Sequence, residues 1–262
     1  MHLEAIQRAK NERADLLVFP ELSLTGYFLR DMVPDVAIPS NAPELTQLAE
    51  AAGDMAAVVG FVEETSQHHF YNAAAFLEQG NVKHLHRKVF LPTYGLFEEQ
   101  RHFAAGDRMR AFDTERFGRV GVLVCEDFWH LSSMAIMQAE EVDLLICIAN
   151  SPARGVDGPH LRTEETYRLL SKTFAQLLGA VVVVVNRVGF EDGLCFWGGS
   201  MAMGPDGEEI VSAPLFDETV LVASFDLGEL RRRRISTPLG RDERLLLLIE
   251  ELQRVKRHRY ER

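Results

Sequence analysis

Three polar residues of this sequence each come directly after a run of residues that favours a β-strand: Glu21, Lys88 and Cys125. Loops at the ends of strands are where α/β folds place their chemistry, so the three side chains can meet at one edge of a sheet. A carboxylate, an ammonium and a thiol together would supply a general base, a cation that stabilises an oxyanion, and a nucleophile.

A thiol is only slightly ionised at neutral pH, so Cys125 needs a neighbouring base or cation to become a competent nucleophile. Glu21 would take the thiol proton and later activate a water molecule. Lys88 and the backbone N–H of Glu126 would stabilise the oxygen of a tetrahedral intermediate. The residue types alone leave a structural alternative open, in which Glu21 is a solvated turn residue, Lys88 extends to solvent and Cys125 packs in the core.

The sequence motifs around these three residues identify a protein family more specifically than the spacing of the residues does. They read Phe-Pro-Glu-Leu-Ser-Leu-Thr-Gly-Tyr at 19–27, Arg-Lys-Val-Phe-Leu-Pro-Thr-Tyr-Gly-Leu-Phe-Glu-Glu at 87–99 and Val-Leu-Val-Cys-Glu-Asp-Phe-Trp at 122–129. In this order they resemble the glutamate, lysine and cysteine signatures of the nitrilase superfamily of carbon–nitrogen hydrolases. Shorter blocks at 150–152, 186–189 and 199–200 also match, so the resemblance covers residues 3–226.

The resemblance implies an α/β fold of the four-layer αββα sandwich type, paired into a homo-oligomer, with no metal and no organic cofactor. Carried over to this chain, Glu21 is the general base, Lys88 the oxyanion stabiliser and Cys125 the nucleophile. A further family glutamate matches Glu99 and not its neighbour Glu98, and it would orient Lys88 or the substrate.

Within the superfamily, the sequences of these motifs are similar to those of the glutaminase domain of glutamine-dependent NAD synthetases. The glutamine pocket of that group matches five positions here, which are Tyr27, Tyr94, Phe97, Glu126 and Ser151. A carboxylate at Glu126 suits a substrate ammonium. The arginine that grips the glutamine carboxylate in that group lies near the place of Asp157 here, and Arg154, which is closer to Ser151, would substitute for it.

Alternating helical and β-rich patterns predict one domain over 1–262, with a core at 3–226 and a C-terminal helical extension at 227–262. We expect helices at 2–12, 43–52, 131–141, 163–178 and 242–259, with Thr163 as a cap. We expect strands at 16–19, 56–62, 73–78, 82–86, 119–124, 143–149, 181–185, 200–203 and 220–226. The family opens with a strand that this sequence lacks, so we expect the natural protein to be longer by roughly twenty residues, a strand and a turn.

Composition excludes several classes of protein. The chain has 262 residues and a net charge of −11, which disfavours nucleic-acid binding, and no apolar run is long enough for a membrane span. Three scattered cysteines provide no disulfide framework or zinc motif and fit the cytoplasm. Two features concern association: the basic run 231–234 favours salt bridges or an oligomer contact, and the apolar residues 245–249 predict docking on the body or on a partner subunit.

The sequence therefore predicts an amidase that cleaves a small non-peptide amide through a cysteine thioester. One alternative is a glutaminase-like subunit that supplies ammonia to a separate NAD synthetase. Others are a nitrilase or an acyltransferase with the same triad, and a scaffold that retains the fold without catalysis.

Overall fold

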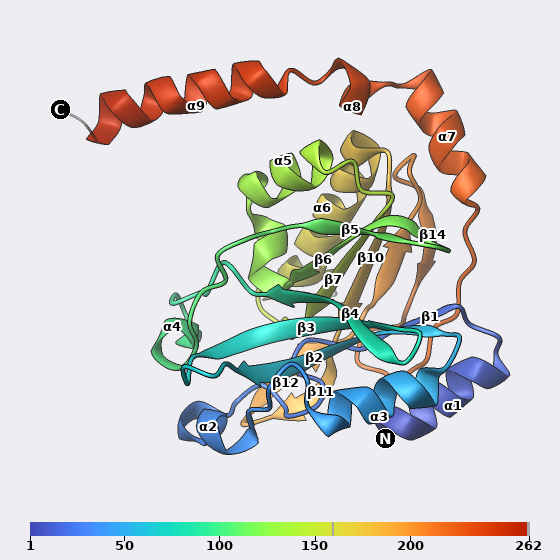
Figure 1. Ribbon diagram of the computed structural model, residues 1–262, viewed down its shortest axis with the longest axis vertical. Helices are drawn as coiled ribbons and strands as arrows, with labels where there is room; N and C mark the ends of the chain where they lie inside the picture. The colour runs from blue at the N-terminus through green and yellow to red at the C-terminus, as the bar shows by residue number, and fades with distance from the viewer. Residues whose placement is uncertain (159, 261–262) are drawn as a thin grey trace.

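Two β-sheets pack face to face, and helices cover the outer side of each (Figure 1). The computed structural model describes residues 1–158 and 160–260. The first sheet has the strand order β1-β2-β3-β4, formed by Leu16–Val18, Ala56–Glu64, Phe70–Glu78 and Asn81–Arg87. The second has the order β14-β13-β10-β7-β6-β5, formed by Glu209–Ser212, Met201–Met203, Val181–Asn186, Leu144–Ala149, Gly118–Val124 and Ala111–Thr114.

Alternation along β2 shows how the layers are built. Ala56 and Val58 face the second sheet, whereas Ala57 and Val59 face the helices α1 (His2–Asn11) and α3 (Pro43–Ala52). On the far side of the second sheet lie α5 (Leu131–Ala139) and α6 (Arg162–Leu178). The order of layers is helix, sheet, sheet, helix, which confirms the αββα sandwich.

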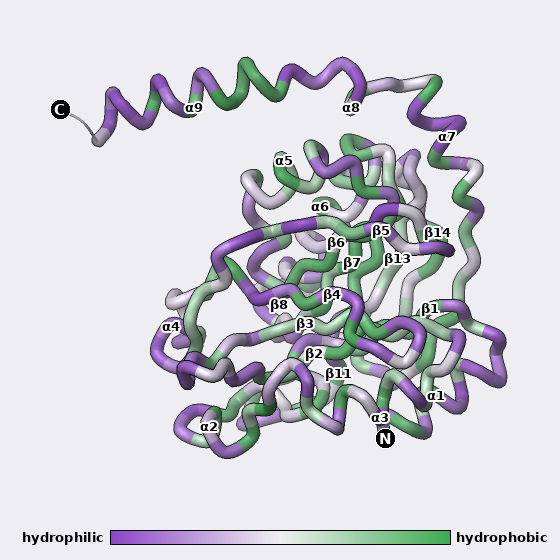
Figure 2. The backbone as a smooth tube through the Cα atoms, viewed as in Figure 1, coloured by the Kyte–Doolittle hydropathy of each residue, from purple (hydrophilic) through white to green (hydrophobic). Residues whose placement is uncertain are grey.

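The shorter elements lie at the sheet ends and in the C-terminal extension. Near the sheet ends are η1 (Arg30–Met32), α2 (Val33–Val36), α4 (Glu99–His102), η2 (Cys125–Trp129) and the strand pairs β8–β9 (Val156–Asp157, His160–Leu161) and β11–β12 (Val188–Glu191, Leu194–Trp197). The extension consists of α7 (Leu227–Ser236), α8 (Leu239–Asp242) and α9 (Leu245–Tyr260). Hydrophobic residues are concentrated in the strands of the two sheets. Helix α9, which lies outside the sandwich, also carries a hydrophobic stretch (Figure 2).

Most predicted elements are confirmed, and three details are wrong. Residues 220–226 form no strand; instead the turn at 205–207 leads directly into β14, which pairs antiparallel with β13. A short hairpin closes with less loss of chain entropy than a distant pairing does. The helix expected at 242–259 is α9, but it begins at Leu245, and Asp242 ends the separate short helix α8. Thr163 does not cap α6, whose N-cap is Leu161 without a side-chain bond.

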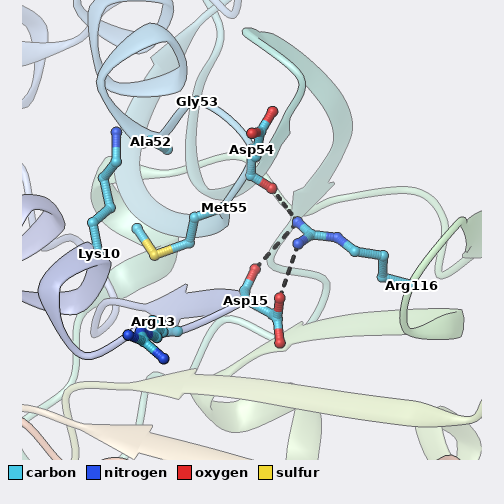
Figure 3. A pocket seen from close by; sticks show the side chains of 9 residues that line it. Lys10, Arg13, Asp15, Ala52, Gly53, Asp54, Met55 and Arg116 are labelled. Atoms are coloured by element: carbon cyan, nitrogen blue, oxygen red, sulfur yellow. Dashed lines mark hydrogen bonds and ion pairs between the residues drawn. The ribbon is translucent and has the colours of Figure 1, made fainter.

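Arg116, in the turn between β5 and β6, ties the second sheet to the helical layer of the first (Figure 3). Its guanidinium donates to the Asp15 carboxylate at 3.0 Å and to the backbone carbonyl of Asp54. Lys10 donates to the carbonyl of Ala51 at 3.0 Å. Both cations therefore complement carbonyl groups at or near the end of α3. The contacts of Arg116 link the second sheet to the helical layer beside this pocket.

In the part of the chain that the structure describes, no helix combines the length and apolar character needed to cross a membrane. The basic run 231–234 lies on α7, where Arg232 pairs with Asp226 at 3.1 Å and Arg234 pairs with Asp143 at 2.7 Å. The predicted salt bridges are thus present.

Gly60 of β2 generates the first prediction. A Cβ atom there would lie 2.4 Å from the Leu22 nitrogen and 2.7 Å from the Pro20 oxygen, both backbone atoms of the loop that carries Glu21. We expect Gly60→Ala to lower the free energy of unfolding by about 1–3 kcal/mol, the usual cost of overpacking, measured by urea denaturation. Gly240→Ala is the matched control, because a Cβ at Gly240 meets no atom within 4 Å and should be near neutral. Equal effects of the two substitutions would contradict this packing argument.

Candidate active site

Glu21 lies just beyond β1 with its side chain fully buried. One carboxylate oxygen accepts hydrogen bonds from Lys88 Nζ at 2.8 Å and from Asn72 Nδ2 at 2.7 Å. The other accepts from the backbone N–H of Asn150 at 2.6 Å, and the Asn150 side chain donates to the Glu21 carbonyl at 2.8 Å. Such charge-assisted bonds satisfy a buried carboxylate and set its direction.

Lys88 begins the loop after β4 and has no solvent exposure at all. Its ammonium lies 2.8 Å from a Glu21 oxygen and 2.7 Å from a Glu99 oxygen. Burial alone would lower the pKa of Lys88, but the charges of Glu21 and Glu99 outweigh it, and the pKa lies well above its ordinary value. The lysine is therefore a fixed cation.

Glu99 opens α4 and is buried, whereas its neighbour Glu98 is exposed. The hydroxyl of Tyr27 donates to Glu99 at 2.6 Å. Burial raises the pKa of Glu99 to about 7, against the opposing charge of Lys88. Tyr27 is itself held by Glu191 in β11, whose carboxylate accepts from the Tyr27 N–H at 3.2 Å.

Cys125 is the first residue of η2 and follows β6 directly, at a tight turn where its φ is 47°. A non-glycine residue in this left-handed region costs free energy that the surrounding structure must offset. The sulfur lies 3.5 Å from the hydroxyl oxygen of Tyr167 in α6. Burial and the charge of Glu21 raise the pKa of the Cys125 thiol, while Lys88 and the Tyr167 hydrogen bond act in the opposite direction.

Asp127 connects the cysteine turn to the lysine loop. One of its oxygens accepts from the backbone N–H groups of Val89 at 3.0 Å and Phe90 at 2.9 Å. The other accepts from the Val124 N–H at 3.2 Å and lies 2.8 Å from His86 Nε2. With both Asp127 and His86 buried, this carboxylate fixes Lys88 and Cys125 relative to each other.

Four of the predicted pocket residues, Tyr94, Phe97, Glu126 and Arg154, gather in a second group. The Tyr94 hydroxyl donates to the Glu126 carboxylate at 2.9 Å, and the Tyr94 ring packs edge-on against Phe97 with 5.7 Å between centroids. The Arg154 guanidinium lies 4.9 Å from the Phe97 ring centre, while Asp157 is exposed on β8. Burial raises the pKa of Tyr94 to about 12, helped by Glu126.

Ser151 lies buried at the end of β7, one residue after Asn150. Its backbone N–H donates to the Asn186 side chain at 2.8 Å. The structure thus places Ser151 next to the residue that binds Glu21, whereas Tyr94, Glu126 and Arg154 lie together around the aromatic rings.

Several residues of the site were not identified from sequence. Asn72 and Asn150 contact Glu21 and Tyr167 contacts Cys125, while Asp127, His86 and Glu191 hold the surrounding loops. Asn150 stands after a predicted strand, as Glu21 does, and that signal could have found it. Within residues 1–158 and 160–260, no group of three or more His, Cys, Asp or Glu side chains could hold a metal ion.

Comparisons with known proteins show which family and which solved structures this chain is similar to. Residues 1–235 match the carbon–nitrogen hydrolase family. The chain is 33% identical over 234 residues to the glutamine-dependent NAD(+) synthetase of Acinetobacter baylyi, covering 89% of this chain and 42% of that protein. It is 31% identical to the solved NAD+ synthetase of Acinetobacter baumannii, with a TM-score of 0.72, and covers 83% of this chain and 40% of that one.

A carbon–nitrogen hydrolase from Helicobacter pylori G27 has the same fold, with a TM-score of 0.84 at 23% identity. The match covers 95% of this chain and 91% of that structure. In contrast, the chain spans about two fifths of the length of the curated synthetases it matches, which limits the comparison to that part of them.

Tyr167 allows a test of the thiol environment. Tyr167→Phe removes the hydroxyl but keeps the ring, so the pKa of Cys125 should rise. We expect iodoacetamide to alkylate Cys125 about two- to tenfold more slowly at a given pH, as for the loss of one hydrogen bond. The rate is followed by peptide mass spectrometry in a Cys195→Ser background, because Cys195 is only partly buried. Tyr260→Phe, at an exposed position, is the control, and an unchanged rate in Tyr167→Phe would contradict the contact.

Glu99 predicts a pH dependence of stability. Its folded pKa of about 7 lies above the ordinary value of 4.5, so the native state holds the proton more tightly than the unfolded chain does. The resulting stabilisation is complete below pH 4.5 and is lost as the pH rises through 7. In Glu99→Gln the fall in unfolding free energy over this window should be shallower by up to about 1.4 kcal/mol per pH unit. Urea denaturation of both proteins measures the two slopes, and equal slopes would refute the raised pKa.

Proposed function

The chain belongs to the carbon–nitrogen hydrolase family, and we propose that it acts as an amidase with Cys125 as the nucleophile. The observation that carries this proposal is the buried Glu21–Lys88–Glu99 network beside the strained cysteine turn. A lysine without solvent exposure, held between two carboxylates, is costly for stability alone and suits stabilisation of an oxyanion.

In the first half of the proposed reaction, the raised pKa keeps the Cys125 thiol neutral at rest. As the sulfur bonds to the amide carbon, the thiol proton passes to Glu21. The carbonyl oxygen becomes negative and is stabilised by Lys88 and by the Glu126 N–H. The C–N bond then breaks, and the departing nitrogen takes the proton from Glu21, which leaves a thioester.

In the second half, a water molecule attacks the thioester carbon. Glu21 accepts a proton from the water as the new C–O bond forms, and a second oxyanion is stabilised at Lys88. The C–S bond breaks, the proton returns to the sulfur, and the carboxylic acid is released. Glu99 acts through Lys88, by holding the ammonium in place.

The pocket group supports a glutamine-like substrate as a second, narrower candidate. Glu126 offers a carboxylate for a substrate ammonium, and the Arg154 guanidinium beside Phe97 offers a cation for a substrate carboxylate. A small amino acid that carries a side-chain amide fits this pair of charges. The relatives named glutamine-dependent NAD(+) synthetase favour the same candidate, with ammonia passed to a separate synthetase.

Hydrolysis of an amide panel tests both candidates. L-glutamine, propionamide, an N-carbamoyl amino acid and a nitrile are followed by mass spectrometry of the products. We expect Cys125→Ala to lose at least about a thousandfold in kcat on any accepted substrate, because it removes the nucleophile. Cys195→Ser should retain activity and serves as the control. Equal rates for wild type and Cys125→Ala on every compound would overturn the amidase proposal.

Arg154→Ala separates the two candidates in the same assay. If the guanidinium binds a substrate carboxylate, KM for glutamine should rise about tenfold or more, the loss of one charge-assisted contact, while propionamide hydrolysis is unchanged. An equal effect on both substrates would argue against the glutamine-like candidate and leave the simple amidase.

A further inference from the structure

Tyr167 is buried beside the nucleophile, yet none of the proposed steps uses it. It lies in α6, on the outer side of the second sheet (Figure 1), and its hydroxyl oxygen is 3.5 Å from the Cys125 sulfur. Glu21 and Lys88 follow strands of the first sheet. The base and the cation therefore come from the first sheet, whereas the phenol comes from the helical layer that covers the second.

The packing of the Tyr167 ring does not account for its hydroxyl. The ring centroid lies 6.1 Å from that of Phe128 and 5.9 Å from that of Trp197, both of which are buried. A phenylalanine would make the same apolar contacts with these rings. Because a buried hydroxyl costs free energy unless it is hydrogen-bonded, the contact with the Cys125 sulfur is the feature that a phenylalanine would lack.

Both groups of this contact hold their protons in the resting protein. Burial and the neighbouring Cys125 raise the pKa of Tyr167 well above its ordinary value, and burial also raises the pKa of the Cys125 thiol. The Trp129 side chain donates to the Tyr167 oxygen, which leaves the hydroxyl proton for the sulfur. Once the sulfur has lost its own proton, only the phenol can be the donor of this contact.

The strength of this hydrogen bond differs between the stages of the proposed reaction. A negatively charged sulfur accepts strongly from a phenol, whereas the uncharged sulfur of a thioester accepts weakly. The Tyr167 hydroxyl is therefore poorly satisfied in the thioester and well satisfied when the sulfur leaves as a thiolate. Since a buried donor without a good acceptor raises the free energy of its state, the contact favours breakdown of the thioester.

We propose that Tyr167 is a catalytic residue of the second half of the reaction, where its hydroxyl donates to the Cys125 sulfur as the C–S bond breaks. This role rests on the amidase proposal. Water has by then added to the thioester carbon, and its proton is on Glu21. The electron pair of the C–S bond stays on the sulfur, which accepts the Tyr167 hydrogen bond until the proton moves from Glu21 to the sulfur. Tyr167 keeps its own proton throughout. Lys88 is already paired with Glu21 and Glu99, so Tyr167 supplies a donor that these carboxylates do not neutralise.

Burst kinetics with p-nitrophenyl propionate test this role. The ester releases p-nitrophenolate as it acylates Cys125, and it leaves the same propionyl thioester that propionamide would form. The burst measures acylation and the later steady rate measures deacylation. In Tyr167→Phe we expect the steady rate to fall about ten- to a hundredfold, as for the loss of one hydrogen bond to a charged group. The burst rate should fall less, because the thiol from which acylation starts already has this contact.

Two further measurements separate the role of Tyr167 from a loss of folding. The burst amplitude counts the working nucleophiles, so both rates are taken per active site. Intact-protein mass spectrometry of quenched samples should show a larger fraction of propionyl-enzyme in Tyr167→Phe than in wild type, while Tyr260→Phe, at an exposed position, should match wild type. A steady rate that falls no more than the burst rate would overturn the role of Tyr167 and leave the amidase proposal standing. Equal release by wild type and Cys125→Ala would overturn both.

Discussion

The contact on which the site depends is the buried ammonium of Lys88 between the carboxylates of Glu21 and Glu99. The free-energy cost of removing this charge from water is offset only because both carboxylates and their hydrogen-bond donors are already in place. Those donors come from β3, from the residue that follows β7 and from the loop at Tyr27. The two sheets must therefore be packed together in a single register before the lysine can be buried. The site consequently forms only when the fold is complete.

Much of the fold could be predicted because its signals are local. The valine run of β10 and the apolar run of β7 are typical of central parallel strands, and Gly179 ends α6 in the left-handed conformation that glycine adopts readily. The strand predicted at 220–226 was wrong because the composition of these residues suits a strand, whereas strand pairing depends on a neighbouring strand that composition does not reveal. The last helix was predicted to begin three residues early, because the position of a helix end depends on local backbone geometry that composition does not reveal.

The three residues of the proposed triad stood out from residue types and sequence motifs, but the residues that contact them did not. Asn72 lies within a buried strand, where an amide reads as a simple polar interruption, and only the fold brings it to Glu21. Tyr167 reads as one core position on an amphipathic helix, 42 residues from the cysteine it contacts. Asp127 was visible in the cysteine signature, but its bonds to the lysine loop depend on the tertiary structure.

The carboxylate of Glu191 gives the site a mechanical extension. It lies at the end of β11 in a hairpin outside both sheets, and it receives the backbone N–H groups of Tyr27 and Phe28. Tyr27 in turn holds Glu99, and Glu99 holds Lys88. A sequence change in this hairpin is therefore transmitted to Lys88 through three successive contacts. Such a change can alter the activity of the enzyme although all three sequence motifs are unchanged.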